Sequence, residues 1–206
     1  PLTSMSFALN LAISREPWTF RVPNLLMHVE LCAILFALTR EVFRRTAAAW
    51  IATLLFAFHP IHTEPLNTIV GRADVASTLL MFWALLIWWR DGEAQHGRFA
   101  PLAGGLMMLA AVFFKESAVV AIGMMPLLDL YRARGGGVDA DWWSRRLKRC
   151  YLPLALAVGA LLVARYFVIG KLGGSPDVFI LDNPIATAPE LVPEGGSYFL
   201  LRWGTP

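Results

Sequence analysis

Six apolar runs dominate the chain and leave little of it for a soluble fold. They lie at 23–43, 47–63, 69–89, 99–114, 117–131 and 150–169. About 20 predominantly apolar residues cross the hydrocarbon core of a bilayer as a helix. The 206 residues are 57% hydrophobic and 16% charged, whereas soluble chains have about 45–50% apolar and about 25% charged residues. The sequence therefore predicts an all-α fold, a polytopic transmembrane helix bundle of about six spans.

The basic residues predict which way this bundle faces. Eleven of the 18 Lys and Arg residues lie in the loops of one side: Arg40, Arg44, Arg45, Arg90, Arg98, Arg132, Arg134, Arg145, Arg146, Lys148 and Arg149. Cytoplasmic loops of membrane proteins carry an excess of Lys and Arg, so we assign this side to the cytoplasm. The net charge of +3 then reflects topology and does not indicate a nucleic acid partner. Membrane lipid is expected to surround the bundle.

This orientation divides the chain into three parts. Residues 1–22 are the remnant of an outer loop, 23–169 form the bundle, and 170–206 are a truncated outer loop. Because the chain starts at Pro1 and stops abruptly at Pro206, we expect a fragment of a longer multi-pass protein.

The remaining ionisable and amide groups gather at the outer ends of the runs. They are Asn24, His28, His59, His62, Glu64, Arg72, Asp74, Lys115, Glu116, Asp182 and Asn183. Ionisable residues in or beside membrane spans are costly to keep there and are functional candidates for that reason. Any chemistry is therefore predicted on the outer face, near the membrane surface.

The sharpest stretch is the turn from His59 to Pro65. Pro60 ends or kinks a helix, which leaves two imidazoles and a carboxylate on a short irregular segment. Imidazole and carboxylate groups can act as general acid or base, or bind a divalent cation. Arg72 and Lys115 can neutralise a phosphate. These groups suit a lipid-phosphate substrate whose head group lies at the interface.

Structural roles remain open for the same groups. His59 and His62 could cap a helix end, Arg72 and Asp74 could form an ion pair, and Lys115 with Glu116 could be a solvated loop tip. For Asn24 and His28, hydrogen bonding between helices is favoured over catalysis. Glu30, inside the first run, requires a partner. Two His and one Glu are too few ligands to assign a metal site, although a divalent cation stays open.

Five short motifs in the same order resemble a known family. They are 1–10, 24–28, 59–64 with 70–74, 114–116 and 182–184. The chain resembles the transmembrane and tetratricopeptide-repeat proteins, whose membrane part is similar to GT-C glycosyltransferases. Pro65 departs from the small apolar residue usual in the family, and the match fades after Pro184.

The resemblance implies an O-mannosyltransferase with a polyprenyl- or dolichyl-phosphate-linked mannose donor and Ser or Thr hydroxyls of an acceptor protein. It implies an integral protein of the ER membrane or the bacterial inner membrane, with a luminal or periplasmic active face. In the family the main acidic base lies in a first outer loop, which would precede Pro1, and the repeats would follow Pro206. The fragment alone is therefore expected to be inactive.

The chemistry of the outer-face residues suggests roles for them in such a reaction. His62, Glu64 and Asp74 are expected to support catalysis, with Asp74 orienting Arg72. The expected substrate-binding residues are His59, Arg72, Lys115, Glu116, Asp182 and Asn183. Three other functions stay open: a non-catalytic membrane anchor of a repeat scaffold, a transporter-like membrane protein, and a GT-C enzyme with another sugar or acceptor.

Overall fold

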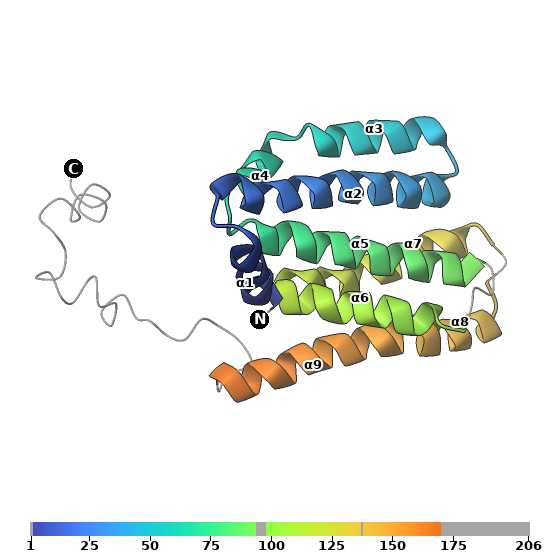
Figure 1. The fold of residues 1–206 in the computed structure, drawn as a ribbon. Helices are drawn as coiled ribbons and strands as arrows, with labels where there is room; N and C mark the ends of the chain where they lie inside the picture. Colours follow the sequence, from blue (N-terminus) through green and yellow to red (C-terminus); the bar gives the residue numbers. More distant parts are fainter. Residues whose placement is uncertain (1, 94–97, 137, 170–206) are drawn as a thin grey trace, which may run out of the picture. The chain divides into compact units, whose positions relative to one another are not determined.

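The computed structural model describes residues 2–93, 98–136 and 138–169, and every regular element among them is a helix (Figure 1). The prediction of an all-α fold is therefore confirmed. The bounds are α1 Leu2–Ile13, α2 Pro17–Phe43, α3 Thr46–Ala57, η1 Pro60–His62, α4 Thr63–Asn67, α5 Arg72–Glu93, α6 Ala100–Phe114, η2 Glu116–Val120, α7 Ala121–Arg134, α8 Ala140–Arg146, η3 Leu147–Tyr151 and α9 Leu152–Ile169.

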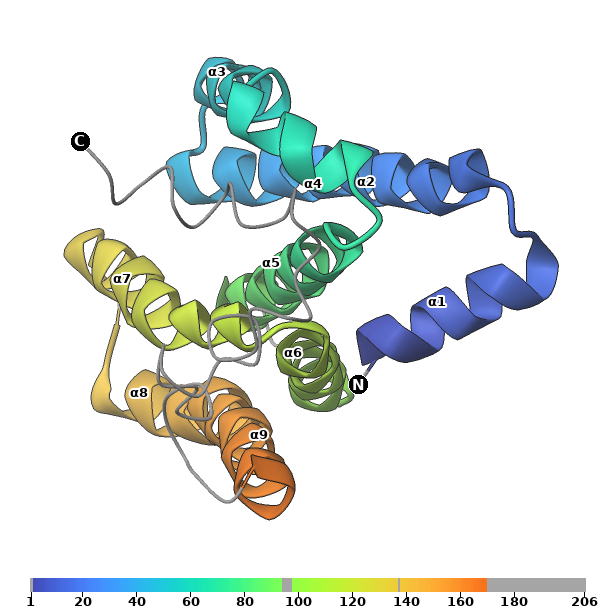
Figure 2. The ribbon, with the colours of Figure 1, turned by 90° about the vertical axis from the view of Figure 1, so that its left-hand side faces the viewer.

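The chain divides into two units, 1–163 and 164–206, and the boundary falls inside α9. Within the first unit α5 is central. It packs against α2 on one side and against α6 and α7 on the other (Figure 2). Helix α3 packs against the opposite side of α2, so α2 lies between α3 and α5 (Figure 1).

Three helices among the described residues are long and apolar enough to cross a membrane. They cover Trp18–Phe43, Arg72–Gly92 and Ala140–Phe167, which correspond to three of the six predicted spans. The total of about six is not confirmed.

The other three predicted spans contain shorter helices, each with a local cause. Within the run 47–63 the α-helix ends at Ala57, because Pro60 follows shortly after it. Helix α6 has 15 residues and stops at Lys115, whose backbone is extended. The run 117–131 begins as the 3₁₀ turn η2 before α7.

Both ends of α2 have a local cause. A proline in the first turn is compatible with helix geometry, so α2 begins at Pro17, inside the segment predicted as an outer loop. The helix ends at Arg44, whose φ of 53° is left-handed. A left-handed residue closes a helix, and it turns the chain back into α3. The segment 1–22 thus holds α1 and the start of α2.

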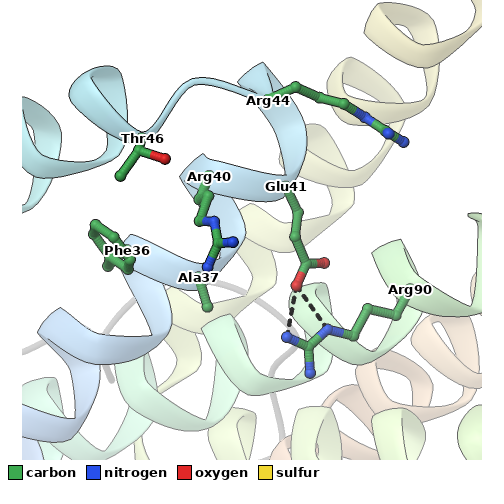
Figure 3. A pocket seen from close by; sticks show the side chains of 7 residues that line it. All are labelled: Phe36, Ala37, Arg40, Glu41, Arg44, Thr46 and Arg90. Atoms are coloured by element: carbon green, nitrogen blue, oxygen red, sulfur yellow. Dashed lines mark hydrogen bonds and ion pairs between the residues drawn. The ribbon is translucent and has the colours of Figure 1, made fainter.

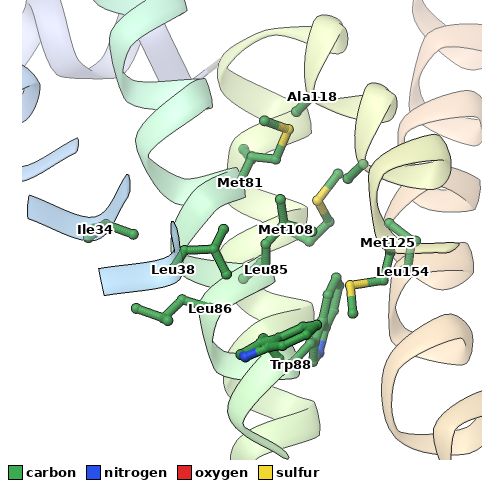
Figure 4. Close-up of a cluster of buried hydrophobic side chains, with 14 of the residues drawn as sticks. Ile34, Leu38, Met81, Leu85, Leu86, Trp88, Met108, Ala118, Met125 and Leu154 are labelled. Atoms are coloured by element: carbon green, nitrogen blue, oxygen red, sulfur yellow. The ribbon is translucent and has the colours of Figure 1, made fainter. Parts of the chain in front are cut away.

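The buried core lies where α2, α5, α6, α7 and α9 face one another (Figure 4). Leu85, Met108 and Met125 are completely buried in it. Trp88 is equally buried and packs against Gly104, where an added Cβ would lie 2.2 Å from the indole Nε1. That close approach joins α5 to α6 and requires glycine.

A buried ion pair joins the elements after the core. Nε of Arg146 on α8 lies 3.0 Å from Oδ2 of Asp129 on α7, and their side chains are 2% and 0% exposed. The hydroxyl of Tyr151 donates to the same carboxylate at 2.8 Å. The Asp129 carboxylate thus contacts both Arg146 and Tyr151. The cluster therefore has a structural role and fixes the connection from α7 to α9.

Candidate functional site

Among the described residues, those predicted for the outer face come from separate elements that meet at one end of the first unit. These elements are α1, the first turns of α2, the segment η1–α4, the start of α5, and the junction of α6 with η2. Thr3 donates to the carbonyl of Phe114 at 2.9 Å, which ties α1 to that junction. We call Asn24, His28, His59, His62, Glu64, Arg72, Asp74, Lys115 and Glu116 the outer-end cluster.

Arg72 is the structural centre of the outer-end cluster. Its side chain donates four hydrogen bonds: to Asn24 Oδ1 at 3.2 Å, to Asn10 Oδ1 at 2.8 Å, and to the carbonyls of Ser6 at 3.1 Å and Phe20 at 3.0 Å. The residue is only 3% exposed. Arg72 therefore joins α1, α2 and α5, and these bonds would have to break before it could contact a ligand.

The proposed ion pair between Arg72 and Asp74 is wrong. Asp74 pairs with Lys115 instead. Side chains two positions apart on a helix do not face each other, so Asp74 points toward the α6–η2 junction while Arg72 points toward α1 and α2. The expectation that Asp74 orients Arg72 fails for the same reason.

Asn24 has the structural role that the sequence favoured, whereas His28 packs through its ring. Asn24 is completely buried, and its amide donates to the carbonyls of Thr68 at 3.2 Å and Pro65 at 3.4 Å. His28 is 7% exposed, and its ring stacks on Phe56 with 5.6 Å between centroids. Asn24 thus connects α2 to α4, which confirms the predicted hydrogen bonding between helices.

The three histidines of this end form a row of rings. The centroid of His62 is 5.3 Å from that of His28 and 6.1 Å from that of His59. Nδ1 of His59 accepts a hydrogen bond from the backbone N–H of Ile61 at 3.2 Å, so the capping role predicted for His59 is confirmed. His62 makes no such cap.

The environment of His62 favours the neutral imidazole. Burial lowers the pKa of His62 below its ordinary value of 6.5, and the nearby His28 and His59 lower it further. His62 lies in η1, outside the three candidate spans. A neutral ring can accept a proton, which is the property that acid–base chemistry requires.

Lys115 and Asp74 form the accessible charged pair of the outer-end cluster. Their side chains are 40% and 44% exposed. The carbonyl of Lys115 accepts a hydrogen bond from Ser77 at 3.2 Å, which holds the junction against α5. Lys115 is therefore a fixed cation at the surface of the cluster and not a freely solvated loop tip. Glu116, the next residue, begins η2 and is exposed.

Glu64 lies in the short helix α4 and is exposed. Its backbone carbonyl accepts a hydrogen bond from the Thr68 hydroxyl at 2.9 Å. Within the described ranges, no three His, Cys, Asp or Glu side chains come together closely enough to hold a metal ion. Asp182 and Asn183 lie outside the described residues.

Comparisons with known proteins identify relatives along most of the chain. Protein O-mannosyl-transferase Tmtc2 of Drosophila melanogaster is 32% identical over 199 residues, which are 92% of this chain and 20% of that protein. Protein O-mannosyl-transferase TMTC2 of Homo sapiens is 28% identical over 214 residues, which are 98% of this chain and 25% of that protein. The chain is a TMTC-like sequence.

A third relative, Protein O-mannosyl-transferase TMTC1 of Homo sapiens, is 32% identical over 64% of this chain and 16% of its own length. The chain thus spans about a fifth to a quarter of the length of the first relatives that it matches. No family model matches the sequence, and no solved structure matches it. The resemblance carried by the five motifs is confirmed.

Two residues of the outer-end cluster region were not predicted from the sequence. Gly71 precedes α5, and an added Cβ there would lie 2.2 Å from the carbonyl oxygen of Pro65. Asn10 is 8% exposed and accepts from Arg72. An amide inside the apolar run of α1 was the available signal for Asn10, because polar side chains bridge helices in membranes.

Glu30, which the sequence left without a named partner, has one in the structure. The indole Nε1 of Trp83 on α5 donates to Glu30 Oε1 at 2.9 Å. The carboxylate is thus hydrogen-bonded between α2 and α5, which meets the requirement stated from the sequence.

Proposed function

We propose that the chain is the membrane part of a protein O-mannosyltransferase. It transfers mannose from a polyprenyl- or dolichyl-phosphate donor to Ser or Thr hydroxyls of an acceptor protein. The observation that carries this proposal is the accessible Lys115–Asp74 pair at the same end of the helices as the histidine row. The printed names of the relatives supply the reaction. The active face is the luminal face of the ER membrane or the periplasmic face of a bacterial inner membrane.

The proposed reaction is a displacement at the anomeric carbon of the sugar. A hydroxyl oxygen of the acceptor bonds to this carbon while the bond to the lipid phosphate breaks, and the hydroxyl proton leaves to a base. Negative charge then grows on the departing phosphate. A donor aimed at developing charge typically contributes about 10²–10³ in kcat.

Lys115 is our choice for the cation that stabilises this phosphate. Its ammonium carries three N–H donors, and only one contact, with Asp74, is needed to hold it in place. Arg72 supports this arrangement indirectly, because its hydrogen bonds fix the start of α5, from which Asp74 projects. We accordingly propose Arg72 as a positioning residue and Asp74 as the partner that orients Lys115.

The acceptor and the sugar hydroxyls are assigned to the turn after α3. His62 is proposed to accept a proton or a hydrogen bond as a neutral imidazole, and exposed Glu64 to bind a hydroxyl. Exposed Glu116, next to Lys115, is proposed to contact the sugar. Asp182 and Asn183 are proposed to shape the same outer side. Lys115 supplies positive charge in this proposal, and a divalent cation stays a possible addition to it.

An apolar cavity next to His59 suits the polyprenyl chain of the donor. Its volume is about 500 Å³, and Ile51, Leu54, Leu55 and Phe58 of the α3 segment line it. The cavity continues to His59 itself. A lipid tail lying along α3 would therefore bring its phosphate to the outer-end cluster. This geometry favours a lipid-linked donor over a soluble nucleotide sugar.

Transfer of labelled mannose by the full-length protein tests the proposal. Lys115→Gln should lower kcat/KM for the polyprenyl-phosphate donor by about 10²–10³. The matched control is Lys148→Gln, which removes an exposed lysine at the other end of the bundle and should leave transfer unchanged. Equal activity of the two variants would refute the role of Lys115. A wild-type protein that transfers nothing would favour the non-catalytic anchor.

A further inference from the structure

A polar cavity lies at the end of α2 and α5 that is opposite the outer-end cluster. Its volume is about 540 Å³, and its charged and hydroxyl-bearing lining consists of Arg40, Glu41, Arg44, Thr46 and Arg90 (Figure 3). The residues come from the end of α2, the start of α3 and the end of α5. None of them takes part in the proposed glycosyl transfer.

The lining carries a net charge of +2, from three arginines and one glutamate. Nε and Nη2 of Arg90 both donate to Glu41 Oε1, at 2.9 and 2.6 Å. Arg40 lies one position before Glu41 and is exposed. No described residue forms an ion pair with Arg40. The cavity therefore presents a cation whose charge is not neutralised beside one whose position is fixed by Glu41.

The start of α3 adds donors of neutral type. Thr46 is the first residue of this 12-residue helix, and the side chain of the preceding Arg45 makes no capping hydrogen bond. The first N–H groups of an uncapped helix carry a partial positive charge. Together with the arginines of α2 and α5, this end of α3 favours an anion in the cavity.

The depth of the cavity in a bilayer indicates what kind of anion it meets. Two candidate spans end beside it, at Phe43 and Gly92. The ends of spans lie at the level of phospholipid head groups. Phe36 and Ala37, one turn deeper on α2, provide an apolar wall of the same cavity. A ligand with a phosphate above and a hydrocarbon portion below matches both parts of the lining.

We propose that this cavity binds the phosphate-bearing head group of an anionic phospholipid. The lipid belongs to the leaflet that faces the arginine-rich loops, which the charge distribution assigns to the cytoplasm. Arg40 and Arg90 contact the phosphate, and the Glu41 carboxylate holds Arg90 in place. The donor lipid of the proposed glycosyl transfer belongs to the opposite end of the same helices, so this inference stands without that reaction.

The test uses the full-length protein in mixed micelles that contain phosphatidylglycerol and phosphatidylcholine in equal amounts. Native mass spectrometry counts the lipids that remain bound. The wild type should retain phosphatidylglycerol in preference. Arg40→Gln should reduce this preference about tenfold or more, since a direct charge-assisted hydrogen bond to the phosphate is stronger than the attraction of an exposed surface charge. Arg40→Lys should keep most of it.

Arg45→Gln is the matched control, because Arg45 is an exposed arginine of the same loop that does not line the cavity. Its lipid preference should equal that of the wild type. Equal losses in Arg40→Gln and Arg45→Gln would overturn the proposal in favour of unspecific surface charge. Displacement of phosphatidylglycerol by excess inorganic phosphate would overturn the lipid assignment and identify a site for the free anion. An unchanged preference in Arg40→Gln would overturn it outright.

Discussion

Replacing Arg72 with Met tests whether this residue stabilises the fold or binds the substrate. The side chain of Met has a similar length and no hydrogen-bond donor. The substitution therefore removes all four hydrogen bonds to α1 and α2. The acceptors left behind include the amide oxygens of Asn10 and Asn24, and both residues are buried. The perturbation is therefore a loss of satisfied polar groups inside the protein.

The expected cost follows from the contacts of Arg72. A hydrogen bond from a charged donor contributes about 1.5–3 kcal/mol, but bonds made by one group do not add independently. Each buried neutral acceptor left without a donor costs about 1–3 kcal/mol, so the two buried amide oxygens together cost about 2–6 kcal/mol. We expect Arg72→Met to lower the free energy of unfolding by about this amount. Arg72→Lys keeps the charge without the planar fork and should recover only part of it.

Unfolding in a detergent titration measures this free energy, and mannose transfer by the folded fraction measures function. Arg21→Met is the matched control, because Arg21 is an exposed arginine of α2 and should change stability by less than about 0.5 kcal/mol. The structural role predicts lower stability of Arg72→Met with nearly normal KM for the donor. Wild-type stability combined with a raised KM or a lost kcat would refute the reasoning and restore Arg72 as a phosphate ligand.

Three further predictions concern other buried or titrating groups. Gly71→Ala should destabilise the protein by about 1–3 kcal/mol in the same titration, because the added Cβ meets the backbone of Pro65; wild-type stability would contradict the close packing. Asp129→Leu should lower the free energy of unfolding by about 3–5 kcal/mol, because Arg146 would stay buried without its ion-pair partner. A smaller loss in the double variant with Arg146→Met would support the pairing. Because the pKa of His62 is lowered, its neutral form persists at and below pH 6.5, so transfer should fall only at more acidic pH; His62→Gln should remove this acidic limb from the pH profile of kcat/KM.

The fold class could be predicted because hydropathy records burial in lipid or protein directly. The runs 23–43, 69–89 and 150–169 correspond to α2, α5 and α9. The span count could not, because apolarity continues through breaks in the backbone. Pro60 interrupts one run, and the extended backbone of Lys115 ends α6 after 15 residues.

The grouping of the site could be predicted, but its pairings could not. Alternation of the runs brought the turn at His59 and the junction at Lys115 to one end, where Asp74 and Lys115 do meet. The partners of Arg72 include Asn10, which is 62 positions away in the chain. Which face of α5 each side chain occupies depends on how α1 packs, and no local pattern contains that information.

Burial separates the charged residues of this end into two energetic classes. The Lys115–Asp74 pair is about 40% exposed on each side, and exposed pairs contribute only about 0–1 kcal/mol. A phosphate that gains charge during the reaction can therefore compete with Asp74 for the Lys115 ammonium at little cost to the fold. Arg72, at 3% exposed, would have to give up four hydrogen bonds and leave two buried amide oxygens unsatisfied, at about 2–6 kcal/mol together. A phosphate therefore draws on Lys115 before it draws on Arg72, which is why the substitution of Lys115 should change the rate and that of Arg72 should change the stability.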